Sequence, residues 1–228
     1  MVSLGGEDLP LKLPVNKEAP ILCLLDSIDG TQHWIRSKNL YCTALTLFTQ
    51  DQSAKYRLRV SMVQSPDGTI VLAREDNSVA QIDGHPSPLR IGHDTVSEVA
   101  DAHVCTVCRR PDHYRILAPL LANGSPFSGL YTFGGNPALV DLAFGRFDAV
   151  FQPDAAEDGQ PIWDWLPGLH IAQRAGCTVL SSDETPFDVV QVAETVIALG
   201  DSERSYIAAA NHNLAREIAA WLRRGKRT

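Results

Sequence analysis

The stretch "APILCLLDSIDGT", residues 19–31, constrains the fold of this chain most strongly. It begins as a continuous apolar run of strand length and ends in Asp26, without alternation of apolar and polar residues. Such a run predicts a buried strand whose carboxyl end delivers an acid to a site. Asp29, Gly30 and Thr31 follow directly, and a glycine lets the backbone approach a ligand closely. We therefore expect a functional site at the end of this strand.

Composition limits the partners that such a site could serve. The chain has 228 residues, of which 44% are hydrophobic and 21% charged, which fits one large domain or two small ones. A formal net charge of -7 argues against nucleic-acid binding, and we give the basic stretch "RRGKRT" at the end no role. The sequence has no apolar run of about 20 residues and no signal-peptide pattern. We expect a cytoplasmic protein without a membrane partner.

The five cysteines favour reduced thiols over a disulfide framework. Cys105, Cys108 and His113 could be three zinc ligands, but a fourth is missing. The stretch "AHVCTVCRR" also alternates like a half-buried strand. A metal or redox role for these residues is therefore disfavoured.

The remaining pattern predicts strands first and a strand-helix alternation later. Strands are expected at Tyr41–Thr49, Tyr56–Gln64, Thr69–Arg74 and His103–Cys108, with a hairpin turn at "SPDG". Helices are expected in "PDHYRILAPLLANG", in "NPALVDLAFG" and in "WDWLPGLHIAQRAG", the last two each followed by a strand. The last strand is expected in "TVIALG", and the closing helix from Glu203 to about Arg223. This order predicts an α+β half with the metal motifs, residues 1–110, joined to an α/β half, residues 111–228.

Two phosphatase chemistries use letters close to "LLDSIDGT". Haloacid-dehalogenase-type enzymes form an aspartyl phosphate with a D-x-D-G-T motif, in which two aspartates at i and i+2 lie on the same side of the chain. Asp26 and Asp29 are three residues apart, so they fail that motif, although "LGDSERS" is similar to the late acidic loop of that family. The other chemistry is metal-assisted hydrolysis, in which several carboxylates hold two Mg²⁺ ions about 3.5–4 Å apart. It favours a bridging Asp26, with Asp29 turning back to the same ions and Gly30 and Thr31 offering N–H groups to a phosphate.

Four segments carry a resemblance to a known family. "LDSIDGTQHW" resembles the D-P-I-D-G-T-x-x-[FW] motif of the inositol monophosphatase family of Mg²⁺-dependent, lithium-sensitive phosphatases. "WDWLPGLHIAQRAGC" is similar to the second motif, and "GGNPALVDLAFGRFDAVF" to the family's substrate loop, buried helix and following strand. "LGGEDLP" stands where the family's G-E-[ED] motif would be. The resemblance implies a layered αβαβα fold and Mg²⁺-dependent hydrolysis of a small sugar or polyol phosphate.

The resemblance also implies roles for individual residues. It gives oxygen ligands for two Mg²⁺ ions, namely Glu7, Asp26, the carbonyl of Ile28, Asp29 and Asp164. Thr31 would help Glu7 to orient the attacking water, Asp26 would bridge both ions, and Gly30 with Thr31 would hold the phosphate. Substrate contacts would come from Gly135, Asn136, Gln152 and Glu157. The substrate itself stays open among inositol phosphate, other sugar phosphates, histidinol phosphate and a nucleotide 3'-phosphate.

The chain departs from the family pattern in three places. Ser27 replaces a proline, and Pro167 belongs to a variant of the second motif. The chain starts just before Glu7, so we expect the family's N-terminal helical pair to be missing and one sheet face to be uncovered. A non-catalytic or truncated remnant that acts as a binding module is therefore the alternative to an active enzyme. The uncovered face, together with Trp34 and Ile35, predicts a homodimer.

Overall fold

The computed structural model describes ten segments of the chain. They are residues 2–6, 19–36, 39–76, 79–82, 96, 98–106, 111–122, 124–152, 161–199 and 205–225. Glu7, Cys108 and Glu157 therefore lie outside the described residues.

The first half of the chain forms a six-stranded sheet, sheet A, with its strands in chain order. They are β1 (Val2–Gly6), β2 (Ile21–Asp29), β3 (Cys42–Gln50), β4 (Tyr56–Gln64), β5 (Ile70–Arg74) and β6 (Val79–Ile82). β1 is parallel to β2, and the later neighbours are antiparallel. The buried strand expected from the opening sequence is β2, which ends at the site. The hairpin expected at "SPDG" joins β4 and β5.

The second half forms a five-stranded sheet, sheet B, in the order β10-β11-β9-β7-β8. Its strands are β7 (His103–Thr106), β8 (Gly129–Tyr131), β9 (Ala149–Phe151), β10 (Thr178–Leu180) and β11 (Ile207–Ala209). β7 pairs in parallel with β8 and β9, while β11 runs antiparallel to its two neighbours. β7 precedes residue 110, so sheet B begins before the expected boundary between the halves.

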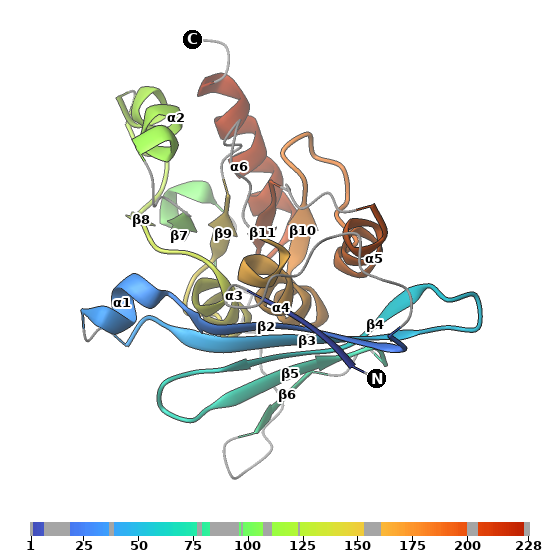
Figure 1. Ribbon diagram of the computed structural model, residues 1–228. Helices are drawn as coiled ribbons and strands as arrows, with labels where there is room; N and C mark the ends of the chain where they lie inside the picture. The colour runs from blue at the N-terminus through green and yellow to red at the C-terminus, as the bar shows by residue number, and fades with distance from the viewer. Residues whose placement is uncertain are drawn as a thin grey trace.

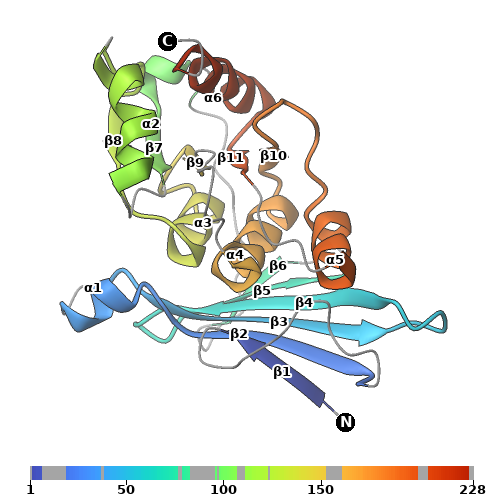
Figure 2. The same cartoon turned by 45° about the horizontal axis from the view of Figure 1, so that its top comes forward.

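Helices separate and cover the two sheets (Figures 1 and 2). α3 (Asn136–Ala143), α4 (Ile162–Arg174) and α5 (Val189–Leu199) lie between sheet A and sheet B. α2 (Pro111–Ala122) and α6 (His212–Gly225) lie on the other side of sheet B. The short α1 (Thr31–Ile35) follows β2 at one end of sheet A, and a 3-10 turn (Val99–Asp101) precedes β7. The described layers are therefore sheet, helix, sheet and helix.

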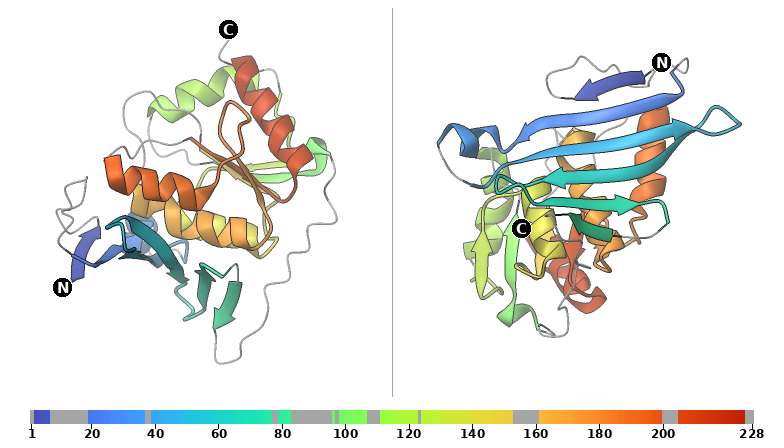
Figure 3. Two further views of the ribbon diagram at one scale, coloured as in Figure 1. Left: turned by 90° about the vertical axis from the view of Figure 1, so that its right-hand side faces the viewer. Right: turned by 90° about the horizontal axis from the view of Figure 1, so that it is seen from below.

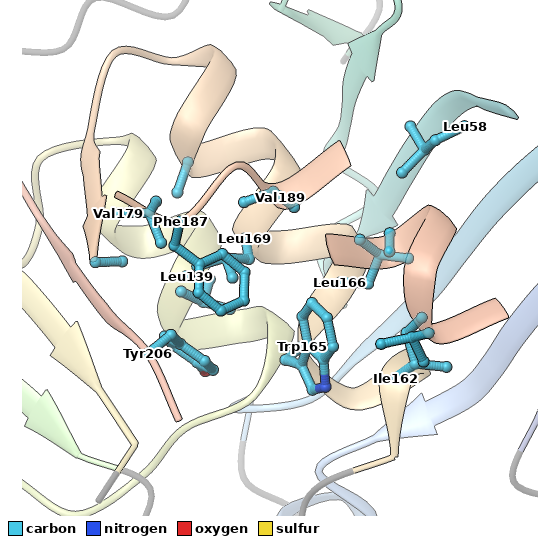
Figure 4. Packing of buried hydrophobic residues seen from close by; sticks show 14 of the residues in the cluster. Leu58, Leu139, Ile162, Trp165, Leu166, Leu169, Val179, Phe187, Val189 and Tyr206 are labelled. Atoms are coloured by element: carbon cyan, nitrogen blue, oxygen red, sulfur yellow. The ribbon is translucent and has the colours of Figure 1, made fainter. Parts of the chain in front are cut away.

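The central core forms where α4 meets its neighbours. Figure 4 shows Trp165, Leu166 and Leu169 of α4 pointing among side chains of α3, β4 and the segment before α5. Trp165 is fully buried and meets Phe187 edge-on, with ring centroids 6.3 Å apart. Burying a large apolar side chain stabilises a fold by about 1.5–3 kcal/mol, so this contact fixes the start of α4 firmly. That start carries Asp164.

Two predicted elements near the C-terminus are wrong. "TVIALG", expected to be the last strand, is the end of helix α5. Its β-branched residues have strand propensity, but Val189, Ala193, Val196 and Ile197 are buried at helical spacing and pack against the core. The last strand is β11, and the closing helix begins at His212 rather than at Glu203.

One face of sheet A carries a row of apolar side chains. This row crosses four strands in register and consists of Leu25, Leu45, Met62 and Leu72, each partly exposed. In the described part of the chain, the helices that cover sheet A lie on its opposite face (Figure 3). The uncovered sheet face and the loss of an N-terminal helical pair both stay predictions.

Candidate active site

A cavity of about 630 Å³ opens at the carboxyl end of β2. Its wall comes from four places in the sequence: the end of β2, α1, the loop before α3 and the start of α4. The lining residues are Asp26, Ile28, Asp29, Gly30, Thr31, Gln32, His33, Arg36, Thr132, Phe133, Gly134 and Asp164. Asp26, Asp29 and Asp164, predicted to act together, thus face one space.

The end of β2 breaks its regular pairing to present the two aspartates. The register with β3 shifts between Asp26 and Asp29, which marks a bulge, and bulges re-aim side chains. Asp26 accepts a hydrogen bond from the backbone N–H of Ile28 at 3.1 Å, and Asp29 accepts one from that of Asn136 at 2.7 Å. Both carboxylates are buried, with exposed fractions of 1% and 3%. Because buried carboxylates are costly without partners, these bonds stabilise both side chains and help to fix their orientation.

Gly135 brings the substrate-loop segment against Asp29. Its φ of +79° suits glycine, and a Cβ added there would lie 2.6 Å from one carboxylate oxygen of Asp29 and 2.8 Å from the other. A side chain would therefore displace that carboxylate. The resemblance predicted a substrate contact for Gly135, whereas the structure gives it a role in positioning Asp29; the substrate contact stays a prediction.

The turn after β2 is held by its own hydrogen bonds. Gly30 has a φ of +90°, and its carbonyl accepts from the N–H groups of His33 and Trp34. The hydroxyl of Thr31 donates to the carbonyl of Ile28 at 2.9 Å. This bond fixes the Thr31 hydroxyl next to the carbonyl that was predicted as a metal ligand, and leaves the hydroxyl oxygen able to accept a hydrogen bond from a water.

The side chain of Asn136 replaces a backbone hydrogen bond that α4 lacks next to Asp164. Pro167 lies inside α4 and has no N–H, so the carbonyl of Trp163 loses its helical donor. The Asn136 side chain donates to that carbonyl at 2.9 Å and accepts from the N–H of Gly168 at 2.7 Å. Asn136 itself is fully buried and is not part of the cavity wall. Its predicted role in substrate binding stays a prediction, and its observed role is to join α3 to the helix that carries Asp164.

A buried thiol lies beside the carboxylates. Cys42 on β3 is opposite Asp29 in the sheet register and has an exposed fraction of 1%. Burial raises the pKa of the Cys42 thiol well above its usual value, and the negative charges of Asp29 and Asp26 raise it further. Cys42 therefore stays protonated and adds no charge to the site.

Comparison with known proteins identifies the architecture. Neither a family model nor a curated protein matches the sequence. Solved structures match nearly the whole chain. The extragenic suppressor protein suhB from Bartonella henselae matches with a TM-score of 0.72 and 17% identity, over 98% of this chain and 78% of that one. SuhB from Mycobacterium tuberculosis matches with a TM-score of 0.69 and 23% identity, over 98% of this chain and 76% of that one. An inositol monophosphatase from Zymomonas mobilis matches with a TM-score of 0.67 and 17% identity, over 97% of this chain and 75% of that one.

The chain has the inositol monophosphatase fold. At these sequence identities the likeness shows how the helices and strands are arranged. The chemistry of the site has to be argued from the residues of this chain. The inositol monophosphatase fold accounts for the position of the cavity, because β2, α1 and α4 meet there.

The donors in this inositol monophosphatase fold suit a hard cation. Three carboxylates and the carbonyl of Ile28 line the cavity, and Mg²⁺ takes oxygen ligands of this kind. Among the described residues, no three His, Cys, Asp or Glu side chains are close enough together to form a metal centre by themselves. A cation here would therefore also use carbonyl, water and substrate oxygens, and Glu7, the remaining predicted ligand, lies outside the described residues.

The cavity wall and the set of predicted site residues do not coincide. Gln152 is buried and not part of the cavity wall, and its side-chain oxygen has no hydrogen-bond partner among the described residues. Its contact with substrate stays a prediction, as does that of Glu157. The sequence analysis missed His33, Arg36, Thr132 and Phe133, which line the cavity. For His33 and Arg36, the signal was their position on the helix that follows the aspartate motif.

Cys105 lies in β7 as a buried free thiol whose pKa is raised by burial. It therefore supports the expected strand and gives no support to a zinc site. Within the described residues, no helix is long and apolar enough to cross a membrane.

Proposed function

We propose that this protein is a Mg²⁺-dependent phosphomonoesterase that hydrolyses a small sugar or polyol phosphate. One observation carries the proposal: Asp26, Asp29 and Asp164 line a single cavity at the end of β2, together with Ile28 and Thr31. The fold supports it, since a dual-specific IMPase/NADP phosphatase with this fold was solved with D-inositol-1-phosphate bound.

Each residue has a defined task in this proposal. Asp26, Asp29, Asp164 and the carbonyl of Ile28 would hold the cations, with Glu7 as a further ligand. Bound Mg²⁺ would supply activation of a water and stabilisation of charge on the leaving oxygen. The Thr31 hydroxyl, fixed by its bond to Ile28, would accept a hydrogen bond from the attacking water and so orient it. Gly30 and Thr31 would receive the phosphate.

The direct test is phosphate release from a panel of sugar and polyol phosphates. We expect release with Mg²⁺, none with chelator, and a loss of at least about 100-fold in Asp29→Asn, because a neutral amide is a poor Mg²⁺ ligand. Asp67→Asn, in the exposed turn between β4 and β5, is the matched control and should keep full activity. Activity that is indifferent to chelator would reject the proposal.

Two rival chemistries predict different results in the same preparation. An aspartyl-phosphate mechanism predicts a trappable phosphoenzyme on Asp26, and we expect none. A non-catalytic remnant predicts neither phosphate release nor Mg²⁺ binding in the intact, folded chain.

We also propose that the protein acts as a homodimer. Trp34 and Ile35 on α1 are 49% and 62% exposed, and neither lines the cavity. A symmetric dimer would bury such side chains from both subunits at once. The cytoplasmic location and the absence of nucleic-acid and membrane partners stay predictions.

A further inference from the structure

The wall of the acidic cavity includes an arginine, Arg36, at the end of α1. His33 on α1 and Arg36, the C-cap residue directly after α1, both line the cavity. Trp34 and Ile35, between them, do not line it. This side of the cavity is thus polar, and Arg36 gives it a positive charge, whereas the carboxylates among the described residues of the wall are those of three aspartates.

Arg36 has a guanidinium that the described structure does not use. Arg57, Arg59, Arg146 and Arg223 each form an ion pair with a carboxylate. Within the described residues Arg36 forms none, although three aspartates line the same cavity. Its side chain is exposed to solvent, so it can turn toward a ligand at little cost.

The cavity is also larger than one phosphate requires. Its volume of about 630 Å³ is in the usual range for sites that enclose a whole small molecule. A phosphate held by Gly30 and Thr31 would lie at the start of α1, whereas Arg36 directly follows its last residue, so Arg36 is placed to meet a more distant part of the same substrate.

We propose that Arg36, with His33 beside it, binds a second anionic group on the substrate. The inference rests on the proposed phosphatase activity and narrows its substrate class to phosphate monoesters that carry another phosphate or a carboxylate. A guanidinium matches both groups, because its N–H fork can bind two oxygens at once. Arg36 is in this view a specificity-determining residue that contacts substrate away from the bond that breaks.

A matched series of substrates tests the proposal. Glucose 1-phosphate has a neutral remainder, glucose 1,6-bisphosphate adds a phosphate, and glucuronic acid 1-phosphate adds a carboxylate. With Mg²⁺ we expect kcat/KM to be at least about tenfold higher for one or both charged substrates. Arg36→Gln should lower that preference about tenfold or more, and Arg36→Lys should restore part of it. Arg224→Gln, at an exposed position on helix α6, is the control and should leave the preference intact.

Binding provides a readout that does not depend on turnover. Calorimetry with Ca²⁺ in place of Mg²⁺ should show tighter binding of glucose 1,6-bisphosphate than of glucose 1-phosphate, and the difference should disappear in Arg36→Gln. If Arg36→Gln weakens all three substrates equally, or the wild-type chain shows no preference in either assay, the proposal for Arg36 is wrong. The phosphatase activity itself is decided by the wider panel and the chelator control, so a failure to hydrolyse these three compounds leaves the binding result to decide the role of Arg36.

Discussion

Gly135 is a position where adding one methyl group should reduce activity more than the accompanying loss of stability would explain. In Gly135→Ala the new Cβ would collide with the Asp29 carboxylate, and the positive φ would add strain of about 1–3 kcal/mol. Gly68→Ala has a similar φ of +88° but nothing within 4 Å of the new Cβ. We expect both variants to lose stability in thermal unfolding, and only Gly135→Ala to lose phosphate release by about tenfold or more. Equal activity in the two variants would contradict the role of Gly135.

His170 is a buried titratable residue outside the cavity. Its Nε2 accepts from Arg174 at 3.2 Å, so its Nδ1 carries the proton and donates to Ser61 at 3.0 Å. Ser61 is also within 3.2 Å of the Thr46 hydroxyl. Burial, and then the charge of Arg174, lower the pKa of His170 from 6.5 to about 4. The folded protein therefore keeps this imidazole neutral.

This lowered pKa predicts how stability depends on pH. The unfolded chain binds a proton at His170 below about pH 6.5, whereas the folded chain does so only near pH 4. Stability from this residue is thus complete above pH 6.5 and falls as the pH drops toward 4, by about 2 kcal/mol at pH 4.5. Urea unfolding at pH 7.5 and 4.5 should show a larger loss in the wild-type chain than in His170→Gln. Identical losses would show that His170 does not contribute.

At the scale of elements, the contact between α3 and α4 decides where Asp164 lies. Asn136→Ala removes two hydrogen bonds to buried backbone groups of α4, so we expect a loss of about 2–3 kcal/mol in stability and weaker Mg²⁺ binding. Pro167→Ala restores an N–H that can reach the carbonyl of Trp163. The loss caused by Asn136→Ala should therefore be smaller in a Pro167→Ala background. A double-mutant cycle with chemical unfolding measures this coupling, and strict additivity would argue against it.

The elements also show which parts of the fold were predictable. β4 is predicted to the residue and α4 nearly so, because local apolar spacing and turn residues define them. The strand predicted in "TVIALG" is wrong because this stretch alone shows only strand propensity, whereas the helical spacing of α5 extends over the whole segment from Val189. β11 is a short run, Ile207–Ala209, that becomes a strand by pairing with β9 and β10. That pairing is a tertiary effect without a local signal.

In the site, too, local motifs predict some residues, whereas other contacts depend on tertiary packing. Asp26, Asp29, Thr31 and Asp164 follow from motif order, and the structure places them around one cavity. The repair of α4 by Asn136 depends on two residues 31 positions apart, whose relation appears only once α3 and α4 are packed. Arg36 belongs to no sequence motif, so its place in the cavity wall is seen only in the folded structure.

For the whole molecule, the exposed apolar side chains predict self-association. We expect light scattering at micromolar concentration to give twice the chain mass of 24.9 kDa. Trp34→Ala or Ile35→Asp should shift the protein toward monomer, because each removes apolar surface that a dimer would bury. Glu157→Lys, in the acidic stretch "PDAAEDG" at residues 153–159, is the control and should have a smaller effect. A monomer of the wild-type chain at these concentrations would rule out this dimer.

The central claim is that the cavity at the end of β2 is a cation site to which Asp26, Asp29 and Asp164 contribute ligands. Calorimetric titration with Mg²⁺, with and without inorganic phosphate, tests it without relying on any substrate. We predict binding to the wild-type chain that strengthens with phosphate and is lost in Asp29→Asn, while Asp67→Asn binds normally. Equal heats of binding in the wild-type chain and Asp29→Asn, or no binding in the folded wild-type chain, would contradict the account.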